Sequence, residues 1–261
     1  MMNHIPRKRF GQNFLKDSSV ISHIVDVIGI TEHDHLVEIG PGEGAITLPI
    51  LKMARKLDVV EIDRDLVAAL RLRFSSNPKF SIHEGDALNF RLEDLGTQTK
   101  FRVIGNLPYN ISTPLLFHLF QQSEHIEDMH FMLQKEVVDR MCALPSDSDY
   151  GRLSVMTAYY CEAECLFDVP PESFFPAPKV MSAVVRLSPH RCPPIPVKAK
   201  TLEKVVSTAF SQRRKTLRNS LKSLFDASTL ETMGIDPQAR AETLSLNSFG
   251  RLAAHLERSA E

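Results

Sequence analysis

The sequence lacks the long apolar runs and the paired cysteines that mark several large classes of protein. None of its apolar runs approaches the ~18 residues that a membrane-spanning helix needs. The N-terminal stretch is basic but has no continuous apolar segment behind it, so we expect no secretory signal. The four cysteines show no CxxC spacing and have no histidines at zinc-binding spacing. We therefore expect reduced thiols in a cytoplasmic protein without a metal site.

What the sequence does have is the composition of a globular chain with two parts. It contains 261 residues, of which 43% are apolar and 24% are charged, enough for one large domain or for a domain with an appendage. The segment CPPIPV, residues 192–197, can continue neither a helix nor a central strand. We therefore predict a first domain over residues 1–190, beginning with a basic arm at residues 1–17. A small helical domain follows over residues 191–261.

The net charge of −1 conceals an uneven distribution of charge along the chain. Residues 1–190 carry 19 basic against 25 acidic side chains, whereas residues 191–261 carry 12 against 7. Two basic ends around an acidic middle suggest a polyanionic partner, although a solvated arm and helix would have the same composition. The candidate contacts are Arg7, Lys8 and Arg9 in the arm and Arg213, Arg214, Lys215, Arg218 and Lys222 in the second domain.

The basic residues of the second domain have helical spacing. In the segment QRRKTLRNSLK, Arg214, Arg218 and Lys222 recur every four residues, so they would share one side of a helix. Arg213 falls on the opposite, apolar side of that helix. We therefore expect a helix break near Gln212.

Strand and helix patterns alternate through the first domain. Buried strands are predicted at residues 35–40, 57–63, 80–83, 101–105 and 129–134. Helices are predicted at residues 45–56, 64–74, 114–122 (after a cap at Ser112 and Thr113), 135–144 and 152–160. Two further β-rich runs, residues 164–169 and 180–187, are predicted to form an antiparallel pair. The pattern predicts an α/β, doubly wound fold with a mostly parallel sheet of seven strands and helices on both faces.

Glycines and acids follow successive predicted strands. The segment VEIGPGEG places Gly40 and Gly42 where the first strand turns into a helix, close to a nucleotide-like ligand in folds of this kind, although a tight turn alone would explain them. Glu61 ends the second strand, where a carboxylate can accept hydrogen bonds from both ribose hydroxyls. Asp63 competes for that role but could simply cap the next helix. Asp86 follows the third strand and could accept a proton from an adenine amino group.

Nothing near this edge of the predicted sheet suits a pyrophosphate. There is no Walker lysine and no cluster of basic residues, and the GxGxG spacing departs from the dinucleotide fingerprint GxGxxG. An adenosine pocket without phosphate contacts favours S-adenosylmethionine over NAD or ATP as the cofactor.

The segment GNLPYNIST, residues 105–113, follows the fourth strand. Pro108 forces Leu107 out of helical geometry, so we expect an extended loop at the carboxyl edge of the sheet, although similar strings also form simple turns. An adenine amine is a poor nucleophile because its lone pair is delocalised into the ring. The Asn106 side chain and the Leu107 carbonyl can accept its two hydrogens and turn the lone pair towards a sulfonium methyl. Tyr109 offers a ring on which an extruded base can stack.

Seven segments in one register, from about residue 7 to residue 255, resemble the bacterial small-subunit ribosomal RNA adenine N6,N6-dimethyltransferases, the kasugamycin-sensitivity enzymes. They are FGQNFL (10–15), EIGPGEG (38–44), VIGNLPYNIST (103–113), FMLQKEVVDR (131–140), YGRLSV (150–155), FFPAPKVMSAVVRL (174–187) and FSQRRKTLRNSL (210–221). The resemblance implies a Rossmann-like class I methyltransferase fold with a small all-α C-terminal domain. It also implies an enzyme that uses S-adenosylmethionine to dimethylate N6 of two adjacent adenosines in the 3′-terminal hairpin loop of small-subunit (16S) ribosomal RNA.

The resemblance also assigns site residues. The positions that match cofactor contacts of the family are Asn13, Leu15, Gly40, Glu61, Asp86 and Asn106. Phe174 matches an aromatic that packs against the target base, although it could instead anchor its loop. Phe175 follows where the family usually has a smaller or polar residue, which leaves open which ring faces the pocket. We expect a monomer that acts on ribosomal RNA or on a pre-assembled small subunit.

Three other functions compete with this interpretation. A large-subunit ribosomal RNA adenine methyltransferase of the macrolide-resistance type would share the fold and the NxPY loop. A ribosome-assembly factor could bind the same RNA with catalysis as a secondary role. A nicotinamide oxidoreductase is the most remote, because the dinucleotide fingerprint is missing.

Overall fold

The computed structural model describes residues 12–96, 99–212 and 214–259. The chain forms two compact units: Met1–Val138 with Glu164–Pro189, and Asp139–Ala163 with His190–Glu261. The second unit thus includes a segment that the proline-rich linker alone would assign to the first domain. The chain passes between the units three times, and prolines mark only the last of these crossings. None of the described helices is long and apolar enough to cross a membrane.

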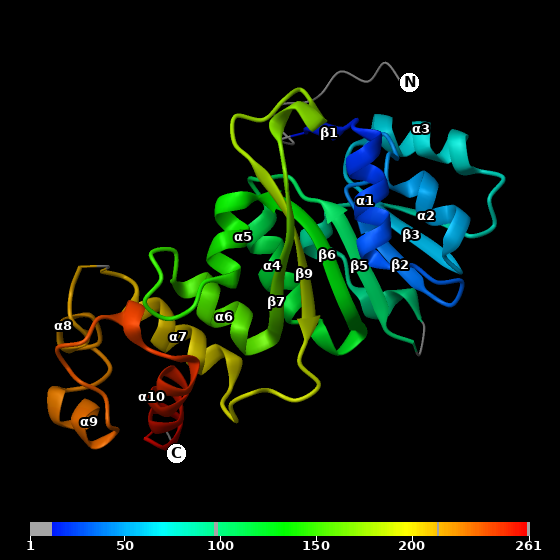
Figure 1. Ribbon diagram of the computed structural model, residues 1–261. Helices are drawn as coiled ribbons and strands as arrows, with labels where there is room; N and C mark the ends of the chain where they lie inside the picture. Colours follow the sequence, from blue (N-terminus) through cyan, green and yellow to red (C-terminus); the bar gives the residue numbers. More distant parts are fainter. Residues whose placement is uncertain (1–11, 97–98, 213, 260–261) are drawn as a thin grey trace. The chain divides into compact units, whose positions relative to one another are not determined.

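The first unit is built on a seven-stranded sheet with the order β4-β3-β2-β5-β6-β9-β7 (Figure 1). Its strands are β2 (His35–Ile39), β3 (Lys56–Glu61), β4 (Phe80–Glu84), β5 (Phe101–Asn106), β6 (Ile126–Gln134), β7 (Cys161–Val169) and β9 (Ser182–Pro189). The strands from β4 to β6 are parallel, and β9 is antiparallel to β6. The predicted seven-stranded, mostly parallel sheet is therefore confirmed.

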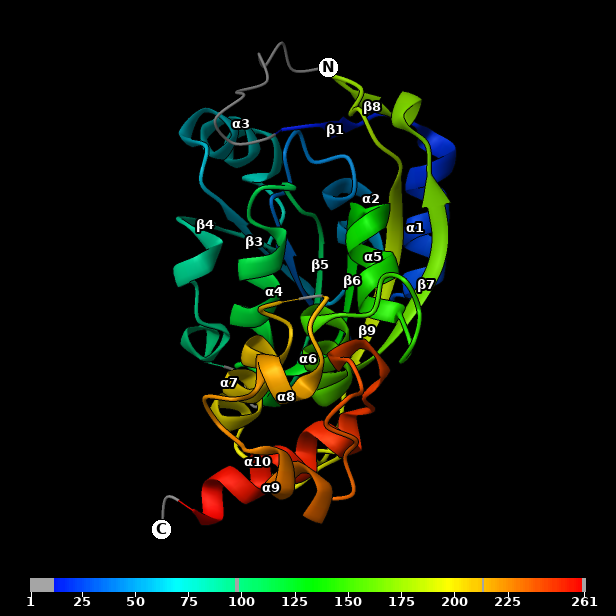
Figure 2. The same cartoon turned by 90° about the vertical axis from the view of Figure 1, so that its left-hand side faces the viewer.

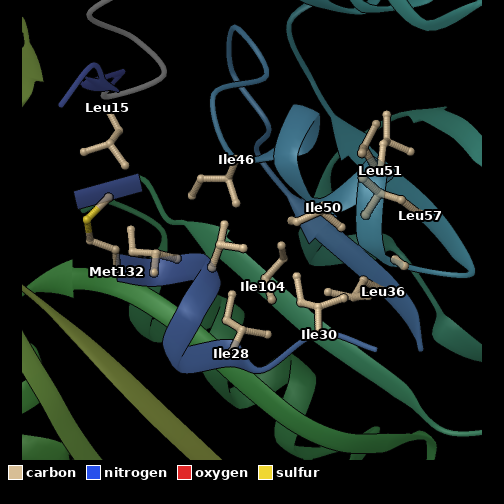
Figure 3. Close-up of a cluster of buried hydrophobic side chains, with 14 of the residues drawn as sticks. Leu15, Ile28, Ile30, Leu36, Ile46, Ile50, Leu51, Leu57, Ile104 and Met132 are labelled. Carbon is tan, nitrogen blue, oxygen red and sulfur yellow. The ribbon is translucent and has the colours of Figure 1, made fainter. Parts of the chain in front are cut away.

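Helices flank the sheet because its strands are apolar on both faces. All five residues of β2 are buried, as expected for a central parallel strand. On one face, α1 (Ser18–Ile28) and α2 (Thr47–Met53) pack against Leu36 and Leu57, as Figure 3 shows. On the other face lies α4 (Ser112–Phe120). The remaining helices of this part of the chain are α3 (Arg64–Phe74), α5 (Lys135–Cys142) and the short 3₁₀ turns η2 (Ala87–Asn89), η3 (Leu92–Leu95), η4 (Ser123–His125) and η5 (Pro171–Ser173).

A second, two-stranded sheet was not foreseen from the sequence. It pairs β1 (Phe14–Leu15) with β8 (Phe174–Phe175) in antiparallel register. Phe14 lies opposite Phe175, and Leu15 lies opposite Phe174. The pair fixes the end of the predicted N-terminal arm to a loop about 160 residues further on.

The second unit is helical, as predicted for the C-terminal part of the chain. Its helices are α6 (Arg152–Tyr160), α7 (Ala199–Ala209), α8 (Leu217–Ser220), α9 (Ala227–Thr232) and α10 (Leu246–Arg258), with a 3₁₀ turn η6 (Ala241–Thr243). The rings of Phe210 and Phe249 pack with centroids 5.8 Å apart. The Tyr150 hydroxyl donates to the carbonyl of Leu244 at 2.8 Å.

The expected break near Gln212 is confirmed, but the helix does not resume over the whole basic segment. The helix α7 ends at Ala209, and α8 contains only four residues. The N–H groups of Leu217 and Arg218 donate to Ala239 O and Pro237 O, so they bond to a neighbouring loop. The expectation that Arg214, Arg218 and Lys222 form one helical row is therefore wrong, because only Arg218 lies in α8.

Candidate active site

A cavity of about 210 Å³ lies at the carboxyl ends of the parallel strands. In an open α/β sheet this edge is where ligands bind. Ten of the residues that the sequence singled out line the cavity together: Asn13, Leu15, Gly40, Gly42, Glu61, Asp86, Asn106, Leu107, Pro108 and Tyr109. These residues come from five separate segments, so the fold assembles the site that the sequence implied.

The glycine turn after β2 forms the floor of this cavity in a conformation that favours glycine. Gly40 and Gly42 have φ angles of +65° and +56°. A Cβ atom at Gly42 would lie 2.9 Å from a ring carbon of Phe14, which is closer than packing allows. The absent side chain therefore lets the Phe14 ring lie directly over the turn.

The Glu61 carboxylate is held by the turn that follows β3. Its Oε1 accepts hydrogen bonds of 2.9 Å from the N–H groups of Ile62 and Asp63. Glu61 is 6% exposed, and burial raises the pKa of its carboxyl, while the hydrogen bonds from the Asp63, Gly42 and Ile62 backbone lower that pKa. Asp63 does cap α3, because its Oδ1 accepts from Asp65 N at 3.1 Å. Glu61, and not Asp63, lines the cavity.

A second buried acid in the cavity was not identified as a site residue from the sequence. Glu38 is 2% exposed, and its Oε2 accepts a hydrogen bond of 2.6 Å from the Thr47 hydroxyl. Burial raises the pKa of Glu38 to about 7, and the nearby Glu61 charge acts in the same direction. The sequence did contain a signal for Glu38. An acid inside the apolar run HLVEI is buried at a cost in free energy, so its presence in a predicted core strand suggests a function.

The Asn106–Tyr109 loop follows β5, and Asn106 is the last residue of that strand. The Asn106 Nδ2 donates to the carbonyl of Asn13 at 2.9 Å. The Leu107 N–H donates to Met132 O at 3.1 Å, which ties the loop to the neighbouring strand β6. The Tyr109 hydroxyl lies 2.7 Å from the Ser182 hydroxyl, and burial raises the pKa of Tyr109.

Asp86 lies at the far side of the cavity, where β4 ends. Its Oδ1 accepts a hydrogen bond of 3.0 Å from Leu88 N and thereby caps the short turn η2. Asp86 is among the residues that line the cavity. This is the geometry expected of an acceptor that is held in place by its own cap.

Phe174 does not reach the cavity. It is 1% exposed and belongs to the hydrophobic cluster beneath β1, opposite Leu15. Phe175 is 59% exposed. In this structure Phe174 is the loop anchor that the sequence left as an alternative, because the β1–β8 pairing turns its ring inward.

The basic candidates are only partly covered by the structure. Arg7, Lys8, Arg9 and Arg213 lie outside the described residues. The described ones, Arg214, Lys215, Arg218 and Lys222, are all exposed in the second unit.

The chemistry of the cavity wall fits S-adenosylmethionine. The cavity lining includes the carboxylates Glu61 and Asp86, near the ends of β3 and β4, and apolar side chains such as Ile46 and Leu66. Among the described residues that line the cavity there is no lysine or arginine to neutralise a pyrophosphate. The described residues also contain no cluster of His, Cys, Asp and Glu suited to a metal ion.

Comparison with known proteins identifies the family. Residues 3–258 match the family described as ribosomal RNA adenine dimethylase. The chain belongs to this family. It is 59% identical over 255 residues to the ribosomal RNA small subunit methyltransferase A of Methylococcus capsulatus (strain Bath), with 98% of this chain and 99% of that protein covered. It is 52% identical over 258 residues to the protein of that name from Pseudomonas aeruginosa, with 98% and 96% covered.

Two solved structures of related enzymes share its fold. A dimethyladenosine transferase from Plasmodium falciparum superposes with a TM-score of 0.81 at 25% identity, covering 95% of this chain and 98% of that one. The 23S rRNA methyltransferase ErmE superposes with a TM-score of 0.72 at 26% identity, covering 94% and 100%. The predicted family, Rossmann-like fold class, enzyme class and S-adenosylmethionine cofactor are therefore confirmed.

Proposed function

We propose that this dimethylase transfers methyl groups from S-adenosylmethionine to N6 of two adjacent adenosines in the 3′-terminal hairpin loop of small-subunit (16S) ribosomal RNA. The product is N6,N6-dimethyladenosine. The observation that carries the proposal is the cavity in which the Asn106–Tyr109 loop meets the cofactor residues. The relatives named small subunit methyltransferase A match along nearly their whole length at 52% to 59% identity, whereas the 23S rRNA enzyme is 26% identical.

The cofactor half of the site consists of Asn13, Leu15, Gly40, Gly42, Glu61, Asp86 and Asn106. Glu61 accepts hydrogen bonds from the two ribose hydroxyls, and Asp86 accepts a hydrogen bond from the adenine amino group. The glycine turn allows the backbone to approach the cofactor closely. When bound, the cofactor supplies an electrophilic methyl group on a sulfonium, and no metal takes part.

The acceptor half of the site positions the target amine. Asn106 Oδ1 and the Leu107 carbonyl accept its two hydrogens, so that the lone pair points at the methyl group. Pro108 keeps Leu107 extended for this contact. Tyr109 stacks on the extruded base, and the exposed ring of Phe175 takes the substrate-facing part that the sequence assigned to Phe174.

The RNA is held mainly through its phosphates by basic side chains outside the cavity. The residues are Arg7, Lys8 and Arg9 in the arm and Arg213, Arg214, Lys215, Arg218 and Lys222 in the helical unit, residues 191–261 of which form the RNA-contacting domain. Residues 1–190 make up the catalytic domain. The protein acts as a monomer in the cytoplasm on small-subunit RNA or a pre-assembled small subunit.

The test is methyl transfer from labelled S-adenosylmethionine to small subunits that lack the modification, followed by nucleoside analysis. The expected product is N6,N6-dimethyladenosine at two neighbouring positions, located by primer extension. Asn106→Ala should lower single-cycle turnover by at least about tenfold, because an acceptor worth more than about 1.4 kcal/mol in the transition state is removed. Methylation of large-subunit RNA instead would establish the macrolide-resistance type, and RNA binding without turnover would establish an assembly factor.

A further inference from the structure

The segment Gln12–Lys16, here called the strap, contacts both halves of the active site. The Gln12 Nε2 donates to Asp63 Oδ2 at 3.1 Å, just beyond the end of β3. The Asn13 carbonyl accepts from the Asn106 amide at the end of β5. Between these two contacts, the Phe14 ring lies against the glycine turn that follows β2. Because the strands are ordered β3-β2-β5, the strap crosses three neighbouring strand ends.

The other end of the strap is fixed to the β8 loop. Leu15 pairs with Phe174, and Lys16 N donates to Ser173 O at 2.9 Å. Figure 2 shows β1 lying across the upper edge of the sheet, between α3 and β8. The strap is therefore anchored at one end by backbone pairing and at the other by the Gln12 side chain.

The Asn13 contact determines which atom Asn106 presents to the cavity. The side-chain amide donates through Nδ2 to Asn13 O, so Nδ2 is directed at the strap. In a planar amide, Oδ1 then points away from the strap. The target amine needs a hydrogen-bond acceptor. The Asn13 carbonyl therefore selects the Asn106 amide orientation in which Oδ1 can accept a hydrogen bond from that amine.

The Gln12 contact joins the strap to the turn that carries Glu61. Asp63 is 0% exposed, its Oδ1 is occupied by the helix cap, and its N–H donates to Glu61 Oε1. The Gln12 amide donates to the other oxygen, Oδ2, so one hydrogen bond joins the strap directly to the turn that carries Glu61.

We propose that Gln12 is a positioning residue for methyl transfer. Its bond to Asp63 holds the strap closed, which keeps the Asn13 carbonyl against Asn106 and the Asn106 oxygen turned towards the target amine. The ribose-binding turn and the amine acceptor are thereby linked through one side chain. The inference rests on the proposed function, because the role of Asn106 comes from it.

Three variants of the full chain test this link. Gln12→Asn keeps the amide but shortens the side chain by one methylene, so it cannot reach Asp63 Oδ2. Gln12→Glu places a second carboxylate against Asp63. In Gln12→Glu combined with Asp63→Asn, donor and acceptor exchange sides, while the amide oxygen introduced by Asp63→Asn can still cap α3. Gln121→Glu, an exposed change of the same kind that follows α4 in the first unit and lies outside the cavity lining, is the matched control.

Single-turnover methylation should fall about tenfold in Gln12→Asn and further in Gln12→Glu, with an unchanged KM for RNA. Adding Asp63→Asn should restore most of the activity that Gln12→Glu removes, and Gln121→Glu should match wild type. Hydrogen exchange of the Leu15 and Lys16 amides, measured without RNA, should speed up in both single variants and slow again in the double variant.

Gln12 variants that stay within about twofold of wild type in turnover, with unchanged strap exchange, would overturn the proposal. So would a double variant that is folded but no more active than Gln12→Glu. If wild type fails to methylate small-subunit RNA, the proposed function fails, and the exchange pattern alone then decides whether the Gln12–Asp63 bond holds the strap.

Discussion

At the scale of single residues, Glu61 is an acceptor whose geometry is set before any ligand binds. Backbone N–H groups of Ile62 and Asp63 hold one oxygen of its carboxylate. The substitution Glu61→Gln keeps the size of the side chain but removes its charge. Hydrogen bonds to a charged group contribute about 1.5–3 kcal/mol, so affinity for S-adenosylhomocysteine should fall by about 10- to 150-fold in calorimetry.

The matched control is Glu84→Gln, since Glu84 lies opposite Glu61 in the β3–β4 register but does not line the cavity. Glu84→Gln should bind S-adenosylhomocysteine with the same affinity as wild type. Unchanged binding by Glu61→Gln would show that the ribose hydroxyls are held elsewhere.

Glu38 makes stability depend on pH. Its pKa is about 7 in the folded protein against an ordinary 4.5, so between these values the folded chain holds a proton that the unfolded chain has released. Glu38 therefore contributes stability that is fully present below about pH 4.5 and is lost as the pH rises through about 7. Glu38→Gln has no carboxyl group to ionise at this position, so it should not lose this stability as the pH rises.

Urea unfolding of the cofactor-free protein at several pH values measures the effect. The free energy of unfolding of Glu38→Gln relative to wild type should rise between pH 5 and pH 8, by up to about 3 kcal/mol at about 1.4 kcal/mol per pKa unit. A difference between the two proteins that stays constant over this range would mean that Glu38 is ionised in the fold.

At the scale of elements, the sequence predicted those whose pattern is local. The central strands are buried runs followed by glycines or acids, and the predicted helix at residues 64–74 has the bounds of α3. Gly40, Gly42, Glu61, Asp86 and Asn106 were found for the same reason, since each lies at or just after the end of a strand. Asn13 and Leu15 follow no predicted strand and were assigned only by the family resemblance. The two-residue strands β1 and β8 have no periodicity to detect, and their pairing joins segments about 160 positions apart.

Two features that the sequence did not predict, the inward orientation of Phe174 and the end of the helix before Leu217, also depend on contacts between segments far apart in the chain. Which of two adjacent phenylalanines faces inward is decided by the pairing of β8 with β1, and nothing within residues 174–181 reveals it. The apolar spacing around Leu217 continues that of α7. The helix nevertheless stops, because backbone donors there bond to residues 237–239 and Thr216 forms a bridge with Arg240.

The position of Phe175 on β8 makes a testable difference to RNA recognition. Stacking of one base on an aromatic ring contributes about 1–3 kcal/mol, so Phe175→Ala should lower kcat/KM for RNA by about 5- to 150-fold and leave the KM for S-adenosylmethionine unchanged. Phe175→Tyr should retain activity. Leu72→Ala, which removes an 83% exposed apolar side chain from α3, is the control. Equal kinetics in Phe175→Ala and wild type would remove Phe175 from the substrate contacts.

At the scale of the whole molecule, the charges of the cavity lining differ from those of residues 191–261. The lining of the cavity carries acids and, among its described residues, no lysine or arginine. Residues 191–261 carry 12 basic against 7 acidic side chains. If the basic residues of this segment bind RNA, as we propose, then the cationic cofactor and the polyanion do not compete for the same charges.

This separation predicts that RNA affinity and turnover can be changed independently. Replacing Arg214, Arg218 and Lys222 together by glutamine should weaken binding across RNA sequences, because phosphate contacts carry no sequence information. The slope of log K against log salt should flatten by at most ~0.9 for each phosphate that is no longer neutralised. Turnover at saturating RNA should survive, since none of the three residues lines the cavity.

The matched control replaces three exposed basic residues of the first unit, Lys52, Arg55 and Lys100, which lie towards the amino ends of the strands and away from the cavity. Both triple variants lose the same net charge, so a general effect of charge would flatten the two slopes equally. A smaller slope in the Arg214, Arg218 and Lys222 variant alone would assign the phosphate contacts to the helical unit. Equal slopes in that variant and wild type would make these side chains ordinary surface. The RNA contacts would then have to come from Arg7, Lys8 and Arg9.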